Sequence, residues 1–304
     1  KGMKQYLSEQ LHPSVEEPQI LKLRLAHLEA LQVSSSELGD LPPDEIIRQL
    51  QMSCLLHAIY SPHQLRERMV DFWTNHFNIY ARKGPSPYFK PKDDIQVIRK
   101  HALGSVHDLI RASAHSPAML QYLDNQVNQK KDQKGAGANE NYARELLELH
   151  TLGVHAGYTQ KDVQEVARCL TGWTVEDRFM HRKGAFRYDD SRHDKGAKTV
   201  LGVRIPPNGD QSDGEKALDI LVSHPATAKF ISSKICRYFL GDHSDHWSER
   251  MAQTYLDTSG DIVQMIQPLL ESQILQNSPP ILKRPFDFTV SSIRAFAADT
   301  NGDK

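Results

Sequence analysis

The chain contains, at residues 139–153, the stretch Asn139-Glu140-Asn141-Tyr142-Ala143-Arg144-Glu145-Leu146-Leu147-Glu148-Leu149-His150-Thr151-Leu152-Gly153. At 100° per residue, three of its leucines fall with Tyr142 and His150 on one side of a helix, and Glu140, Arg144 and Glu148 fall on the other. A glycine-bearing loop precedes the stretch and Gly153 follows it, as expected for a helix between two loops. The stretch therefore predicts an amphipathic helix whose apolar side packs against other helices.

Helical spacing of apolar residues recurs along most of the chain. One example, on a helix predicted to follow Ser61-Pro62, is the face that contains Met69, Trp73 and Phe77. Another predicted helix is capped by Thr159 and reaches Trp173. Near 185–206 the pattern changes to short alternating runs, which predict strands.

These patterns predict an all-α fold: a multi-helical single globular domain with one small β-hairpin near 185–206. Within one domain over 1–304, we expect an N-terminal helical half (16–173), a β-containing insertion (174–211) and a C-terminal helical half (212–298).

The composition excludes several classes of function. The chain has 37 basic and 38 acidic residues, so we expect no general affinity for nucleic acid. No run of about 18 apolar residues occurs, so no membrane span is expected. The N-terminal residues lack an apolar signal core. Three scattered cysteines predict neither a disulfide framework nor a metal site, and no fingerprint for a bound cofactor is present.

The charged side of the 139–153 helix has two interpretations. Glu140, Arg144 and Glu148 are spaced four residues apart, which is typical of a solvent-facing salt ladder worth about 0.2–0.5 kcal/mol per pair. In a cleft, Arg144 would instead keep one carboxylate ionised while burial raised the pKa of another. Acid/base catalysis needs that difference, so Glu145, Glu148 and Arg144 are the predicted catalytic residues. His150 is expected to be a core histidine.

A second polar cluster lies in Asp71-Phe72-Trp73-Thr74-Asn75-His76-Phe77. Trp73, His76 and Phe77 share one helical face, which is typical of an aromatic core seam. The alternative is a platform on which a sugar ring stacks, with Asn75 and His76 reading its polar groups.

Further candidates have simple structural explanations beside the functional one. Asp124 and Asn125 suit a turn, and Asp162 suits a partner for the Thr159 cap. His193 and Asp194 suit either a polar turn or a contact with an anionic substrate. The residues predicted to bind substrate are Trp73, Asn75, His76, Asp124, Asn125, Asn139, Glu140, Asn141, Asp162, Arg168, Trp173, His193, Asp194 and Lys198.

Several motifs occur together and in a fixed order: 72–77, Tyr122-Leu123-Asp124-Asn125, 139–153, 158–173 and 193–202. With them, the chain closely resembles the bacterial DUF1800 family over roughly residues 45–298. The resemblance implies that these polar residues form a shared feature, but it supplies no activity. It also implies a periplasmic or secreted protein, often encoded beside proteins similar to the alkaline phosphatase/sulfatase superfamily.

Three functional hypotheses follow. The first is a hydrolase that acts on a polar polymer such as a glycan, or on a small polar substrate. The second is a non-catalytic binding or assembly partner of a sulfatase-like enzyme. The third is a metal-dependent enzyme using His76, Glu148, His150 or His193-Asp194, although no established metal-ligand spacing is present and no metal ligand is assigned.

Overall fold

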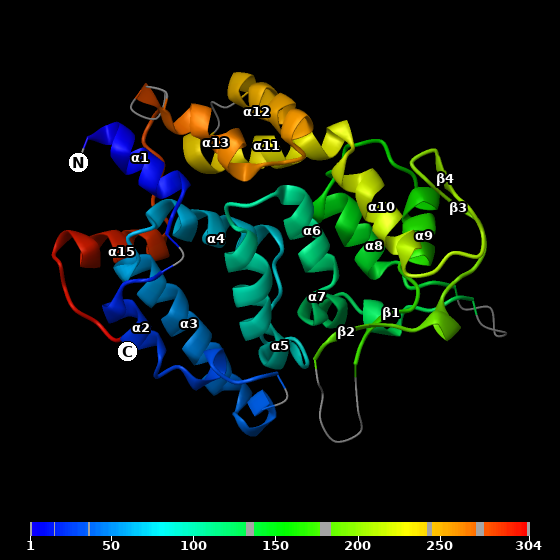
Figure 1. The fold of residues 1–304 in the computed structure, drawn as a ribbon, viewed down its shortest axis with the longest axis horizontal. Coiled ribbons are helices and arrows are strands. Elements are labelled where there is room, and N and C mark those ends of the chain that lie inside the picture. Colours follow the sequence, from blue (N-terminus) through cyan, green and yellow to red (C-terminus); the bar gives the residue numbers. More distant parts are fainter. Residues whose placement is uncertain are drawn as a thin grey trace.

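A computed structural model describes residues 2–14, 16–35, 37–131, 137–176, 184–241, 245–271 and 277–302. Helices dominate this part of the chain, and its only sheets are two small antiparallel strand pairs (Figure 1). The predicted all-α class is therefore confirmed.

The first part of the chain forms the helices that contain the two polar motifs and their neighbours. They are α1 (Met3–Leu11), α2 (Gln19–Leu25), α3 (Pro43–Tyr60), α4 (Gln64–His76), α5 (Ser86–Asp93), the π-helix η3 (Asp94–Arg99), α6 (Val106–Ala114), α7 (Pro117–Tyr122), α8 (Asn141–Glu145), the π-helix η5 (Leu146–His150) and α9 (Gln160–Cys169). Short 3-10 turns lie at η1 (Glu29–Leu31), η2 (Glu37–Asp40), η4 (Asn125–Val127) and η6 (Asp190–Arg192).

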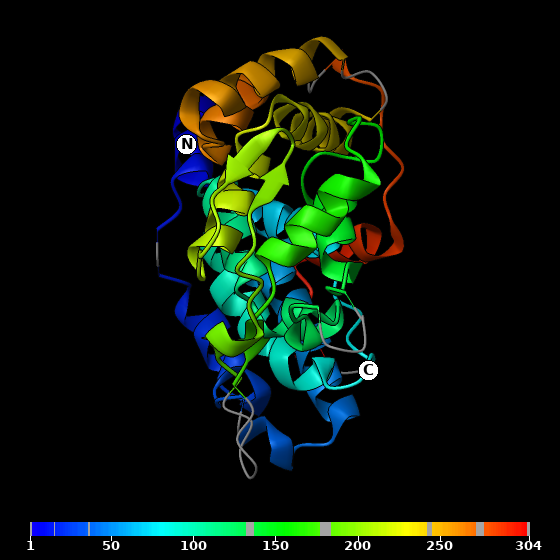
Figure 2. The same cartoon turned by 90° about the vertical axis from the view of Figure 1, so that its right-hand side faces the viewer.

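The second part contains the strands and the remaining helices. These elements are β1 (Trp173–Val175), β2 (Phe186–Tyr188), β3 (Lys198–Val200), β4 (Val203–Ile205), α10 (Ser212–Val222), α11 (Pro225–Leu240), α12 (Asp245–Thr258), α13 (Ile262–Glu271) and α15 (Pro285–Ala295). Helices α11, α12 and α13 group together at one end of the molecule, and the hairpin of β3 and β4 lies over α9 (Figures 1 and 2). Helix α15 returns to pack beside α3, far from it in sequence.

The β region differs from the expected single hairpin. β3 pairs with β4 across a tight turn at Leu201-Gly202, where both residues have positive φ, as a two-residue hairpin turn requires. β2 pairs instead with β1. The expected helix to Trp173 ends earlier, because Gly172 adopts φ +81° and turns the chain into β1.

The core is one large cluster of buried apolar side chains that reaches from Leu11 in α1 to Leu269 in α13. Two smaller clusters lie under α2 and α3, around Leu21 and Ile46. The large cluster takes residues from both expected helical halves and from the strands between them. It fixes α4, α8, α9 and α11 against one another and so positions the polar motifs.

Candidate functional site

Helix α8 and the π-helix η5 form the 139–153 motif, which was expected to be one regular helix. Tyr142, Leu146 and His150 point into the core, as the wheel predicts. A π-helix such as η5 is wider than an α-helix; it is rare and often found at functional sites. It ends at Thr151, whose hydroxyl donates to the Leu146 carbonyl at 2.6 Å.

The charged side of the motif forms a half-exposed ladder. Arg144 lies 3.1 Å from Glu140 and 3.7 Å from Glu148, and it donates to the Gln160 amide oxygen at 2.9 Å. Gln160 in turn donates to Glu140 at 2.6 Å. The ladder therefore ties the motif to the first turn of α9.

Glu145 and Glu148 differ in their surroundings. Burial and the neighbouring Glu148 raise the pKa of Glu145, and Arg144 opposes this rise only in part. The Tyr158 phenol, whose pKa is raised mainly by burial, is hydrogen-bonded to Glu148. Two neighbouring carboxyls are thus present at the surface of the motif, and burial raises the pKa of one of them, Glu145.

The second motif meets the first inside the core. His76 donates from Nε2 to the His150 carbonyl at 3.1 Å, and Lys234 of α11 donates to His76 Nδ1 at 2.8 Å. Burial, with added repulsion from Lys234, holds the pKa of His76 well below its usual value and lowers that of His150 to about 3. Both imidazoles are therefore neutral at physiological pH.

Both predicted stacking tryptophans are fully buried. Trp73 donates from its indole to the Ala102 carbonyl at 3.2 Å and packs against Phe72 and Phe77. Trp173 lies against Gly214, and the His115 ring is tilted by 35° against it with the ring centroids 4.6 Å apart. Neither ring presents a face to solvent, which favours the core-seam interpretation, whereas Asn75 is exposed.

The asparagines of the motifs bind backbone rather than an open site. Buried Asn125 donates to the carbonyls of Leu170 and Trp173 at 3.3 and 3.0 Å. Asn141 donates to the Leu123 carbonyl at 3.1 Å, next to Asp124, which adopts φ 61°. The backbone N–H of Asn139 donates to the side-chain oxygen of Asn128 at 2.9 Å.

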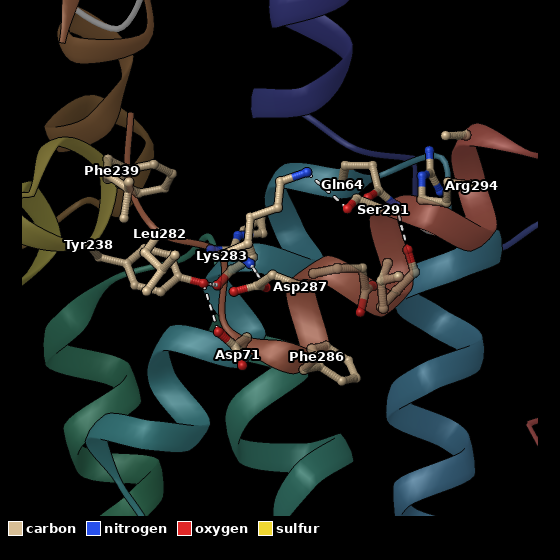
Figure 3. Close-up of a pocket in the computed structure, with 16 residues that line it drawn as sticks. Gln64, Asp71, Tyr238, Phe239, Leu282, Lys283, Phe286, Asp287, Ser291 and Arg294 are labelled. Carbon is tan, nitrogen blue, oxygen red and sulfur yellow. Dashed lines mark hydrogen bonds and ion pairs between the residues drawn. The ribbon is translucent and has the colours of Figure 1, made fainter. Parts of the chain in front are cut away.

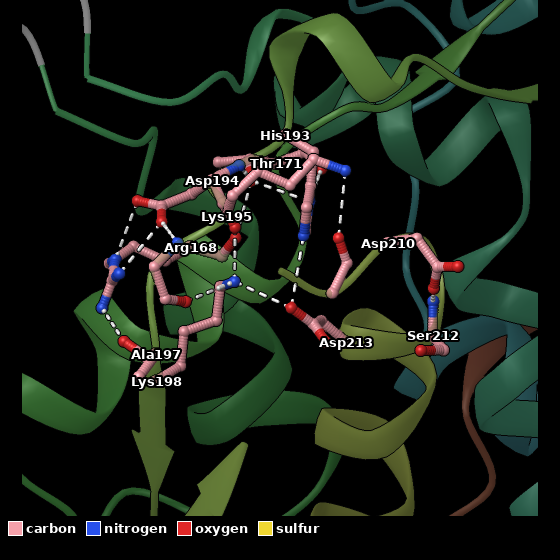
Figure 4. A network of polar contacts seen from close by, with 12 residues as sticks. Arg168, Thr171, His193, Asp194, Lys195, Ala197, Lys198, Asp210, Ser212 and Asp213 are labelled. Atoms are coloured by element: carbon pink, nitrogen blue, oxygen red, sulfur yellow. Dashed lines mark hydrogen bonds and ion pairs between the residues drawn. The ribbon is translucent and has the colours of Figure 1, made fainter. Parts of the chain in front are cut away.

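A network of charges joins α9, the 193–198 loop and α10 (Figure 4). Arg168 makes a two-pronged pair with Asp194 at 2.9 and 3.0 Å, and it also pairs with Glu165 at 3.0 Å. Asp162 caps α9 through Thr159 and accepts from the Leu201 amide at 2.9 Å.

The deepest part of this network contains Lys198, His193 and Asp213, whose side chains are completely buried. Lys198 lies 2.8 Å from the Asp213 carboxylate, and His193 Nε2 lies 3.3 Å from the same oxygen (Figure 4). His193 Nδ1 donates to the Thr171 carbonyl at 2.8 Å. This geometry holds the loop and α10 together but offers no opening to a substrate.

A cavity of about 630 Å³ lies between α4, the end of α11 and residues 281–295 (Figure 3). Asp71, the first residue of the second motif, accepts from the Tyr238 phenol at 2.7 Å and from Arg284 at 2.5 Å. Arg68 pairs with Asp287 on the same wall. Ile281, Leu282 and Phe286 line the apolar side.

The predicted site residues therefore lie in separate places: the α8 ladder, the His76 contact, the asparagine turns and the Arg168 network. Their roles in binding substrate stay predictions. Three residues of these contacts were missed: Lys234, Asn128 and Asp213. In the sequence, each of these residues fits an ordinary helix or loop pattern. Its role becomes visible only in the folded protein, where it contacts a residue distant in sequence.

The described ranges contain neither a metal-type cluster of side chains nor a membrane-spanning helix. No three His, Cys, Asp or Glu side chains there group closely enough to hold a metal ion. None of the helices in those ranges is long and apolar enough to cross a bilayer.

Comparison with known proteins gives the family alone. No curated protein and no solved structure matches the chain significantly. The family model described as "Protein of unknown function (DUF1800)" matches residues 1–303. Since that match covers essentially the whole chain, the protein belongs to the DUF1800 family.

Proposed function

We propose that this protein is a non-catalytic binding and assembly module that docks a protein partner on the surface around α15. The observation that carries the proposal is the exposure of large apolar side chains at the mouth of the 630 Å³ cavity, where Leu282 is 93% exposed. Exposed apolar patches beside a cavity are typical of interaction sites.

The α15 surface, defined here as Ile281, Leu282, Phe286, Phe288 and Phe296, carries exposed side chains of the size that anchors protein interfaces. Its charged neighbours are already paired, as Arg68 with Asp287 and Arg284 with Asp71. An apolar centre with a paired polar rim suits a protein surface better than a small charged substrate.

The use of the motif side chains also supports an assembly role. Arg144, Arg168 and Lys198 all have carboxylate partners within the chain. Such contacts hold helices in register and leave few groups free for chemistry. In the proposal, the motifs make the body rigid and α15 presents the docking surface.

The proposed partner is the sulfatase-like enzyme that the family resemblance implies, and both proteins would act in the periplasm or outside the cell. The test measures binding of the full chain to a purified sulfatase-like protein by biolayer interferometry. Leu282→Asp should weaken binding at least about tenfold, since interface anchors are worth about 1.4 kcal/mol or more.

The matched control is Leu256→Asp on α12, where the leucine is also exposed but lies outside this surface. It should leave binding unchanged, and both variants should melt like the wild type. Equal loss in the two variants, or no binding by the wild type, would contradict the proposal.

A second candidate function rests on the raised pKa of Glu145 beside Glu148. A hydrolase acting on a glycan could use the protonated carboxyl as the acid and the Arg144-paired one as the base or nucleophile. Release of nitrophenol from aryl glycosides tests this. Glu148→Gln should abolish turnover without changing the fold, and unchanged turnover would reject the assignment.

A further inference from the structure

We propose that a second cavity, of about 600 Å³, binds a small organic anion whose charged group meets Lys92 and Lys100 and whose apolar body lies against Phe89 and Phe186. The cavity is formed by α5, η3, the start of α7 and β2. It shares no lining residue with the cavity beside α15, so this inference is independent of the proposed function.

The charge of this cavity is not balanced by its own walls. Lys92 and Lys100 are exposed at its rim, and neither forms an ion pair with a described residue. Among the described residues of the lining, Asp93 is the one carboxylate, and it is buried and already paired with Lys90 at 2.8 Å. Two cations therefore face the cavity without a partner, which favours an anionic ligand.

Spacing places a third polar group between the lysines. Lys92 of α5, Gln96 of the π-helix η3 and Lys100, which follows η3, are four residues apart, and all three line this cavity. The Gln96 amide adds a neutral donor to the two ammonium groups.

A buried hydroxyl lines the same cavity. Ser35 is only 6% exposed, and its Oγ has no hydrogen-bond partner among the described residues. A buried polar atom without a partner is costly. The oxygen has almost no accessible surface in this conformation, so it would reach a ligand oxygen only after the side chain turns toward the cavity. This hydroxyl is an observation independent of the lysines.

The remaining titratable groups of the lining do not compete for the anion. His115 donates to the Arg111 carbonyl at 2.8 Å and pairs with Glu215 at 2.8 Å, so both of its nitrogens are engaged. Burial, with repulsion from Lys100, lowers the pKa of His101 and keeps it neutral near pH 7.

Part of the lining is aromatic. Phe89 is buried, and Phe186 is held edge-on to Trp173 at 5.2 Å and to His115 at 4.6 Å. Gly184 approaches Ser35 and Phe89 so closely that a Cβ would lie 2.9 and 3.0 Å from them. The volume is in the range of small-molecule sites, about 300–1,000 Å³. A ring or short apolar chain bearing a phosphoryl, sulfuryl or carboxyl group fits this chemistry.

Calorimetric titration of the full chain with phenyl phosphate, inorganic phosphate and benzyl alcohol tests the inference. Phenyl phosphate should bind saturably, at least about tenfold more tightly than either other probe, because only it supplies both charge and ring. Added salt should weaken binding, as expected for exposed charges. Equal affinity for phosphate and phenyl phosphate would overturn the organic-anion assignment.

Substitutions of lining residues test whether phenyl phosphate binds in this cavity. Lys92→Met and Lys100→Met should each weaken phenyl phosphate binding about fivefold or more, whereas Lys229→Met on α11, an exposed lysine outside the cavity, should not. Ser35→Ala should weaken binding without lowering the melting temperature, since the hydroxyl has no partner to lose in the free protein. Equal effects of Lys100→Met and Lys229→Met would overturn the proposal.

Discussion

Individual charged residues of the motifs differ mainly in burial, and burial decides what their contacts are worth. The Arg144 side chain is 40% exposed, so its pairs resemble ordinary surface salt bridges of about 0–1 kcal/mol. Lys198 and Asp213 are completely buried, where the loss of one partner leaves an unpaired charge in the interior. We therefore expect the buried Lys198–Asp213 pair to matter more for stability than the exposed Arg144 pairs of residues 139–153.

Replacing Asp213 with Asn should destabilise the protein by about 3–5 kcal/mol, because the Lys198 ammonium would lose its counter-charge. Urea unfolding measures this change. The matched control, Asp190→Asn, removes an exposed carboxylate that pairs with Lys195 and should leave the urea midpoint nearly unchanged. Similar midpoints for the two variants would show that the buried network contributes little.

Glu145 gives a prediction about pH. Its pKa is raised above 4.5 in the folded protein, so folding favours the protonated carboxyl and ionisation destabilises the fold. Glu145→Gln should therefore raise the melting temperature at pH 7. The gain should vanish as the pH falls below 4.5, where the carboxyl is protonated in both the folded and the unfolded state. A melting temperature at pH 7 equal to or below that of the wild type would contradict this.

At the scale of elements, glycine positions set how closely the motif segment packs against α11. Gly153 has φ +85°, and a Cβ there would lie 2.7 Å from the Phe230 ring. Gly157 has nearly the same φ, +81°, but nothing lies within 4 Å of its Cβ position. A side chain at either position would strain the backbone, but only at Gly153 would it also clash with a neighbour.

Gly153→Ala should destabilise the protein by about 2–4 kcal/mol, through strain at positive φ and displacement of Phe230. Gly157→Ala should cost only the strain, about 1–2 kcal/mol. Chemical denaturation of both variants measures the difference. Equal losses would mean that Phe230 moves aside without cost.

Much of the helical architecture follows from local signals. The Thr159–Asp162 cap and the inward side of α8 could be predicted because each depends on residues three or four apart. The pairing of β2 with β1 could not, since both strands are three residues long and carry little pattern of their own. Lys234 contacts His76 although the two are 158 residues apart in the sequence, and no local pattern predicts such a contact.

At the scale of the whole molecule, one core cluster joins all of the expected subdivisions. We therefore predict a single cooperative unfolding transition. Trp73 in α4 and Trp173 in β1 both belong to that core and report on it by fluorescence, while circular dichroism reports on the helices. The two transitions should coincide, as two-state unfolding requires. Separate midpoints would mean that the halves unfold independently.

Neither imidazole at the contact between α4 and η5 changes charge in the range where most histidines titrate. His76 is also confined to one tautomer, because its Nε2 donates to a carbonyl while its Nδ1 accepts from Lys234. The contact between α4 and η5 therefore keeps its charge state under mild acidification. In a nuclear magnetic resonance titration, the ring nitrogens of His76 and His150 would keep fixed chemical shifts and serve as internal standards for the rest.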